Sequence, residues 1–357
     1  GGGGPGIGFS LEEAAAINCA TTLTVAVGAL LAARFQLARL IATDRVELVR
    51  QPSRRQRRKA LRGGATAEAL TGHDATDPGA TSRTVTGNPV LWRELRQPLF
   101  GSTWKRWLGI AAVVVAVGTI HATTMNAMRY ETIAVVLVPA IGALMLLLLS
   151  AAAVPAGSIT TELEARTWAT LLTTPLRTHQ ILLPKVAGAL RRLWPPFLFV
   201  TLHLIVCIAR GIAPATVLAL TFAHFAVFAA FLSCTGVFFS LCSRKSAVAS
   251  TLNLSLALTL WLLGPILFGL VVALLTRGGG GDDAFGYFFF SNPAMSYGAA
   301  VVGLCEGNSR YEIGPLTLSR SGFFLLWNIS LGTFLLAACG VLAFAGRHFH
   351  RLSTARI

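Results

Sequence analysis

Seven long apolar runs constrain this chain more than any other feature. They lie at 14–34, 107–126, 133–153, 194–212, 215–241, 249–275 and 322–346. Runs of about 20 apolar residues can cross a hydrocarbon layer about 30 Å thick as helices. They lack the alternation of barrel strands and are much longer than the roughly 9–11 residues of such a strand. Because backbone polar groups must be paired within lipid, we predict an all-α, polytopic transmembrane helical bundle.

Basic residues are distributed unevenly between the segments that join these runs. If residue 1 is outside, the inside segments hold 25 of the 30 Lys and Arg residues, and they are 34–106, 154–193, 242–248 and 347–357. The outside loops hold the other five, Arg129, Arg210, Arg277, Arg310 and Arg320. Cytoplasmic loops of membrane proteins carry such an excess. This placement accounts for the net charge of +15, so we expect a lipid bilayer and no nucleic acid as partner.

The first inside segment divides into a linker and a helix. The N-terminal span within 1–40 is followed by a basic, flexible cytosolic linker at 41–87, which becomes rich in Gly, Ala and Thr. Residues 88–106 then show a helical pattern. Asn88 is a good N-cap and Pro89 suits the first helical position. We predict a helix in the membrane interface that leads into a six-span domain at 107–350.

The inside segment 154–193 is longer and more structured than a simple connection between two spans requires. Thr161 and Glu164 match a capping box, and Glu162 with Arg166 matches an ion pair between residues four apart in a helix. Pro175 predicts that this helix ends, and a second one begins near Thr178. We predict a rigid unit that rests on the membrane helices on one side and meets a soluble partner on the other. The alternative is an amphipathic flank lying on the lipid surface.

The sequence ITTELEARTWATLLTTPLRTHQILLPK, residues 159–185, resembles the first cytosolic loop of the permeases of type 2 ABC transporters. The matching residues are Glu162, Glu164, Arg166, Thr167, Leu171, Leu172, Thr174, Pro175, Leu176, Ile181, Leu182 and Lys185. Pro184 departs from the glycine that is common before the lysine. The sequence NPVLWREL resembles the connecting helix of the same family, and the likeness covers about 88–350.

This resemblance implies an ABC-2 permease, a transport subunit with six core spans plus one preceding span and no catalytic residues. The coupling helix from Glu162 to Leu172, which includes Trp168, would dock on a separate ABC ATPase. Thr174, Pro175 and Lys185 would form the turn of the coupling loop. The connecting helix would contain Asn88, Pro89, Trp92, Arg93 and Glu94, with the last two on its polar side.

The sequence lacks the Gly-x-x-x-x-Gly-Lys-Ser/Thr phosphate-binding loop, so ATP and Mg would be used by the partner and no cofactor would be bound directly. We expect export of an unidentified substrate across a plasma membrane, the bacterial inner membrane. A second permease half is expected as either a second copy or a fused upstream half. The spans 14–34 and 322–346 have similar ends, with Arg-Leu eleven residues after Gly28 and Gly340. This echo suggests that the chain is a fragment whose first span closes an upstream half.

Two histidines lie at similar predicted depths on either side of the turn at Ala213-Pro214. We predict that His203 and His224 face one another, about 15 Å below the outer surface at about 1.5 Å per residue. Neutral imidazoles bonded across helices, a substrate path and a metal site are the alternatives, and the lack of another nearby ligand argues against the metal. A membrane-embedded enzyme using these histidines and a non-transporting scaffold are the competing functions.

The outer loop at 276–321 is too apolar for a solvated loop and too broken for a complete span. We predict either a short helix that dips into the outer leaflet from Asn292-Pro293 or a packed outer cap.

Overall fold

The computed structural model describes residues 88–96, 103–124, 132–174, 176–264, 292–313 and 316–354, together with 266, 267, 270, 271, 274 and 290. The N-terminal span and basic linker predicted over 1–87, Pro175, and most of the outer loop before Asn292 lie outside these residues. The described part is helical apart from one antiparallel β-hairpin, which confirms the prediction of an all-α bundle.

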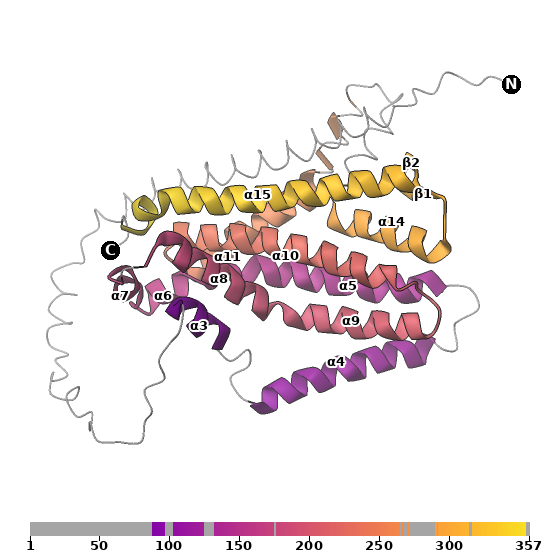
Figure 1. Ribbon diagram of the computed structural model, residues 1–357, viewed down its shortest axis with the longest axis horizontal. Coiled ribbons are helices and arrows are strands. Elements are labelled where there is room, and N and C mark those ends of the chain that lie inside the picture. The colour runs from indigo at the N-terminus through magenta and orange to yellow at the C-terminus, as the bar shows by residue number, and fades with distance from the viewer. Residues whose placement is uncertain are drawn as a thin grey trace.

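The elements follow one another along the chain as labelled in Figure 1. The helices are α3 (Pro89–Arg96), α4 (Thr103–Thr124), α5 (Thr132–Ala153), the 3₁₀ turn η2 (Pro155–Gly157), α6 (Thr160–Glu164), α7 (Trp168–Leu172), α8 (Thr178–Arg192), α9 (Trp194–Ala209), α10 (Thr216–Cys242), α11 (Ser246–Leu258), the π-helical turn η3 (Thr259–Leu263), α14 (Pro293–Glu306) and α15 (Arg320–Thr354). The hairpin consists of β1 (Arg310–Ile313) and β2 (Leu316–Ser319).

Four helical stretches in the described part are long and apolar enough to cross a membrane. They are Ile133–Glu164, Thr216–Cys242, Ser246–Leu263 and Arg320–Leu352. The pair α8 and α9, bent by 43°, makes a fifth if it is one span, and α4 contains a shorter apolar stretch, Gly109–Ala122. A helix therefore lies at each of the six spans that the sequence predicts from residue 107 onward.

Helix α10 is the centre of the bundle and packs against α15, α5 and α11 (Figure 1). Every residue from Phe231 to Cys242 is buried, because this half of the helix is apolar or small on all sides. Gly236 permits the closest approach. A Cβ atom there would lie 2.9 Å from both the Pro155 Cβ and the Asn253 Nδ2.

Helix α14 begins inside the bundle. As the sequence predicts, Asn292 caps it, accepting hydrogen bonds from the backbone amides of Ala294 (3.0 Å) and Met295 (3.3 Å). The Asn292 amide group donates to the carbonyl of Trp261 (2.8 Å) in the π-helical turn. The carbonyl of Pro293 accepts from His224, eight residues into α10, so α14 starts about 12 Å along α10.

We predict that Gly236→Ala lowers the thermal unfolding midpoint of the purified protein. The added methyl group must push α10 away from η2 and Asn253, and overpacking of this kind costs about 1–3 kcal/mol. Gly332→Ala in α15 is the control, since nothing lies within 4 Å of a Cβ there. Equal midpoints for the two variants would contradict this packing.

Candidate functional site

A buried cluster of opposite charges joins three helices at the end of the bundle where α3, α6 and α8 meet (Figure 1). The Lys185 ammonium donates to Glu94 Oε1 at 2.7 Å and to Glu162 Oε1 at 2.6 Å. It also donates to the carbonyl of Ser158 at 3.1 Å. Lys185 is 2% exposed and Glu94 is 4% exposed. Burial of charges at this depth requires close pairing, so the three side chains fix α3, α6 and α8 together.

Two arginines close the rim of this cluster. Arg93 pairs with Glu94 and with Glu162, and Arg192 pairs with Glu94 Oε2 at 3.2 Å. Both arginine side chains are partly exposed, whereas the two carboxylates are buried. The second oxygen of Glu162, Oε2, is also buried, and it has no hydrogen-bond partner among the described residues. Glu162 is therefore the less completely paired of the two carboxylates.

Two residues of α8, Pro184 and Gly188, allow α3 to pack closely against this helix. Pro184 lacks an N–H, so the carbonyl of Gln180 has no helical donor four residues on. The side-chain amide of Asn88 donates to that carbonyl at 2.7 Å. One turn further, Gly188 faces Glu94 so closely that a Cβ would lie 2.9 Å from the Glu94 Cβ. Pro184, which departs from the family pattern, thus supplies an acceptor for the connecting helix.

The predicted start of the connecting helix is confirmed, but its predicted polar face is wrong in one residue. Asn88 Oδ1 accepts from the Val90 and Leu91 amides, and Pro89 is the first helical residue. Glu94 lies in the charge cluster and not on an exposed face, because Lys185 and Arg192 pair with it. Trp92 is 39% exposed, and the Arg96 guanidinium lies 4.4 Å from its ring centroid.

The single coupling helix predicted from Glu162 to Leu172 is wrong, because the structure contains two short helices there. Helix α6 ends at Glu164 and α7 begins at Trp168. Arg166 lies between them with φ 59°, a left-handed conformation that a non-glycine residue adopts only in a turn. The predicted Glu162–Arg166 pair is also wrong, since Glu162 is held by Lys185 and Arg93.

The predicted capping box of Thr161 and Glu164 is replaced by contacts from distant helices. The hydroxyl of Ser240 in α10 accepts from the amides of Ile159 (2.8 Å) and Thr160 (3.0 Å). Thr161 instead donates to the carbonyl of Gly157, and Glu164 accepts from the amide and hydroxyl of Ser246 at the start of α11. The amides at the start of α6 are thus paired with the membrane bundle, which a local sequence pattern does not reveal.

Burial separates the residues assigned to the coupling helix and its turn into three groups. Trp168 is 2% exposed and packs against Phe349 of α15, with ring centroids 6.1 Å apart, and Glu162 is buried. Leu171 and Leu172 are half-buried against the core. Glu164, Arg166, Thr167 and Thr174 are exposed. The first two groups therefore position this segment, and only the exposed residues are available to a partner.

The predicted contact between His203 and His224 is wrong. The Nδ1 atom of His203 lies 3.2 Å from the Nε2 atom of His121 in α4. The Nε2 atom of His203 donates to the carbonyl of Val136 at 3.3 Å. His224 bonds to the Pro293 carbonyl and stacks on Trp327. The two imidazoles serve different helix contacts, so they do not form the common site that an intramembrane enzyme using both would require.

Three buried side chains could hold a soft metal ion: the ligand atoms of His121, His203 and Cys207 all lie within 4.8 Å of one another. Arg210 can only donate, and its guanidinium lies 3.3 Å from His121 Nδ1. His121 Nδ1 is therefore the acceptor, so the His121 proton lies on Nε2 and faces His203. Hydrogen bonds therefore account for this group. His121 lies in a different span from His203, so no spacing along the sequence connects them; its one signal in the sequence is a lone imidazole within an apolar run.

The fold and the charge cluster define a multi-pass membrane protein with a structured segment anchored between two of its spans. The family model described as ABC-2 family transporter protein matches residues 105–349 of this chain, which is well over half of its length. The chain belongs to this family and is a membrane permease of an ABC transporter. A search of curated proteins finds no match.

We predict that Lys185→Met strongly destabilises the purified permease. The change leaves Glu94 and Glu162 buried without their shared cation, and breaking a buried pair in this way costs about 3–5 kcal/mol. Lys245→Met is the control, because Lys245 is exposed. Adding Glu94→Gln and Glu162→Gln to Lys185→Met should recover part of the lost unfolding free energy. Equal stabilities of the Lys185 and Lys245 variants would show that the cluster does not hold the helices.

Proposed function

We propose that this permease couples ATP hydrolysis by a separate ATPase subunit to the export of a substrate. The observation that carries the proposal is the pairing of Lys185 with both Glu94 and Glu162, which joins the cytoplasmic segment to the connecting helix and to α8. A segment held in this way is displaced as a unit when a partner pushes on it, and rigid-body motion of this kind is a common way to transmit a conformational change.

The proposed contact with the ATPase is the exposed turn between α6 and α7. Arg166 and Thr167 lie there, and Arg166 has no ion-pair partner in the part of the chain that the structure describes. Non-glycine residues held in a left-handed conformation often occur at functional sites, because the surrounding structure must offset a cost of about 1–3 kcal/mol. This supports Arg166 as the centre of the docking surface.

Three connections lead from this turn into the membrane bundle. Ser240 links the start of α6 to α10, and Ser246 links Glu164 to α11. Lys185 links Glu162 to α8, which meets α9 at the 43° bend. Pressure on the turn would thus reach three helices. Because Glu162 Oε2 has no hydrogen-bond partner among the described residues, we expect the Glu162 contacts to break first under load.

The wider assembly follows from the same proposal. A permease driven from one cytoplasmic segment needs a partner that binds ATP and Mg, since the sequence contains no Gly-x-x-x-x-Gly-Lys-Ser/Thr loop. We propose a second permease half, either another copy or a fused upstream half, in the bacterial inner membrane. The excess of basic residues in segments 34–106, 154–193, 242–248 and 347–357 supports placing these segments, and with them the proposed ATPase contact, on the cytoplasmic side.

We predict that Arg166→Glu weakens co-purification of the permease with its ATPase subunit and leaves the fold intact, because Arg166 is exposed. Arg320→Glu is the matched control, since the same change of charge then lies at the opposite, outer end of the bundle. The two complexes should be compared by the amount of ATPase retained at increasing salt. Equal retention by the two variants would contradict docking at this turn.

A further inference from the structure

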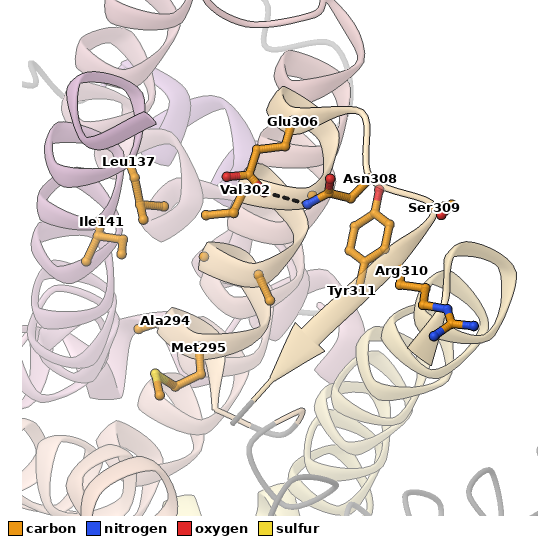
Figure 2. Close-up of a pocket in the computed structure, with 13 residues that line it drawn as sticks. Leu137, Ile141, Ala294, Met295, Val302, Glu306, Asn308, Ser309, Arg310 and Tyr311 are labelled. Carbon is orange, nitrogen blue, oxygen red and sulfur yellow. Dashed lines mark hydrogen bonds between the residues drawn. The ribbon is translucent and has the colours of Figure 1, made fainter. Parts of the chain in front are cut away.

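Two cavities lie side by side along one face of α5. The outer cavity, of about 630 Å³, is shown in Figure 2, and the deeper one has a volume of about 480 Å³. Ala294 and Met295, at the start of α14, line both. The two cavities therefore meet at the point where α14 begins inside the bundle.

A regular stripe of side chains on α5 forms one wall along both cavities. Leu137 and Ile141 line the outer cavity, and Met145 and Leu149 line the deeper one. These residues are four apart, so they lie on one face of the helix. Figure 2 shows Leu137 and Ile141 projecting from α5 toward α14, with Met295 at the inner end of the outer cavity. The stripe spans about 18 Å at 1.5 Å per residue, which suits an extended alkyl chain.

The chemistry of the two cavities differs. The deeper cavity is lined mainly by aliphatic side chains, including Leu148, Leu254 and Leu258. The outer cavity has an apolar wall on α5 and a polar end formed by Glu306, Asn308, Ser309, Arg310 and Tyr311. In Figure 2 a hydrogen bond joins Asn308 to Glu306 at this end. A carboxylate, an amide and a phenol thus lie at one end of a cavity whose wall on α5 is apolar.

Tyr311 provides an independent sign that a ligand binds at the polar end. Its side chain is 1% exposed, yet its hydroxyl has no hydrogen-bond partner among the described residues. Leaving a buried hydroxyl without a partner is unfavourable, because it has lost its hydrogen bonds to water. The ring lies directly against Gly303, where a Cβ atom would clash with it, so the backbone is shaped to hold this tyrosine. Burial also raises the pKa of the phenol, so the hydroxyl keeps its proton and remains a donor.

We propose that the two cavities form one site for a phospholipid-like amphiphile, with its acyl chain in the deeper cavity and its phosphate-bearing headgroup in the outer one. The Tyr311 hydroxyl donates to the phosphate, and Glu306 pairs with a headgroup ammonium. The proposal rests on the proposed function, because it names the class of cargo. The headgroup lies at the predicted outer face, so the amphiphile has the orientation of an outer-leaflet lipid.

The test uses the purified full chain without an ATPase and a lysophosphatidylethanolamine that carries a diazirine at the end of its acyl chain. After photolysis, mass spectrometry should find saturable labelling at Met145, Leu149 and Met295. Met145→Trp should fill the deeper cavity and weaken binding about tenfold, the effect of about 1.4 kcal/mol. Leu146→Trp is the control, since Leu146 neighbours Met145 but does not line either cavity.

Tyr311→Phe tests the headgroup position without disturbing the fold, because the phenol makes no hydrogen bond within the part of the chain that the structure describes. Loss of a hydrogen bond to a charged group should weaken binding of the phosphate-bearing probe about tenfold. Binding of a monoacylglycerol with the same diazirine chain should stay unchanged. Non-saturable labelling of all lipid-facing helices, or equal labelling of the Met145→Trp and Leu146→Trp variants, would overturn the proposal. Because these measurements need no ATPase, they remain separate from the docking test at Arg166.

Discussion

The structure at the end of the bundle where α3, α6 and α8 meet depends on how a low-dielectric interior accommodates one ammonium group. Lys185 can be buried only because two carboxylates from other elements reach it, at 2.7 Å from Glu94 and 2.6 Å from Glu162. Removal of Lys185 would leave both carboxylates buried without the cation that they share, and removal of either carboxylate would leave the ammonium with one partner fewer. This mutual requirement fixes the connecting helix, the start of the coupling segment and α8 relative to one another, although they are distant in sequence.

Helix α10 links this end of the bundle to the opposite end. At one end Ser240 holds the amides that begin α6. Nearer the other end, His224 bonds to the Pro293 carbonyl and Thr221 bonds to Tyr297, both in α14. One continuous, mostly buried helix thus contacts both the segment proposed to receive the ATPase and the half-helix that lines the proposed lipid site. A shift of α10 along or about its axis would affect both sites.

The sequence predicts well what depends on local pattern and poorly what depends on pairing between distant elements. Apolar length indicates the membrane helices, and Asn88 with Pro89 and Asn292 with Pro293 mark two helix starts because a cap acts within three residues. The capping box at Thr161 fails because Ser240, eighty residues away, takes its place. Glu94 has the pattern of an exposed residue, and only the position of Lys185 explains its burial. The contact of His203 with His121 joins two different helices, so no spacing within one helix predicts it.

The central claim is that the charge cluster makes α3 and α8 move as one body during the transport cycle. Spin labels at the exposed positions Trp92 and His179 would report their separation in the complex with the ATPase, with and without bound ATP. The account predicts the same distance distribution in both states for the otherwise unaltered chain, and a distribution that changes between states when Lys185→Met is introduced. If the two helices separate on ATP binding while Lys185 is intact, the cluster does not transmit the motion and the account is wrong.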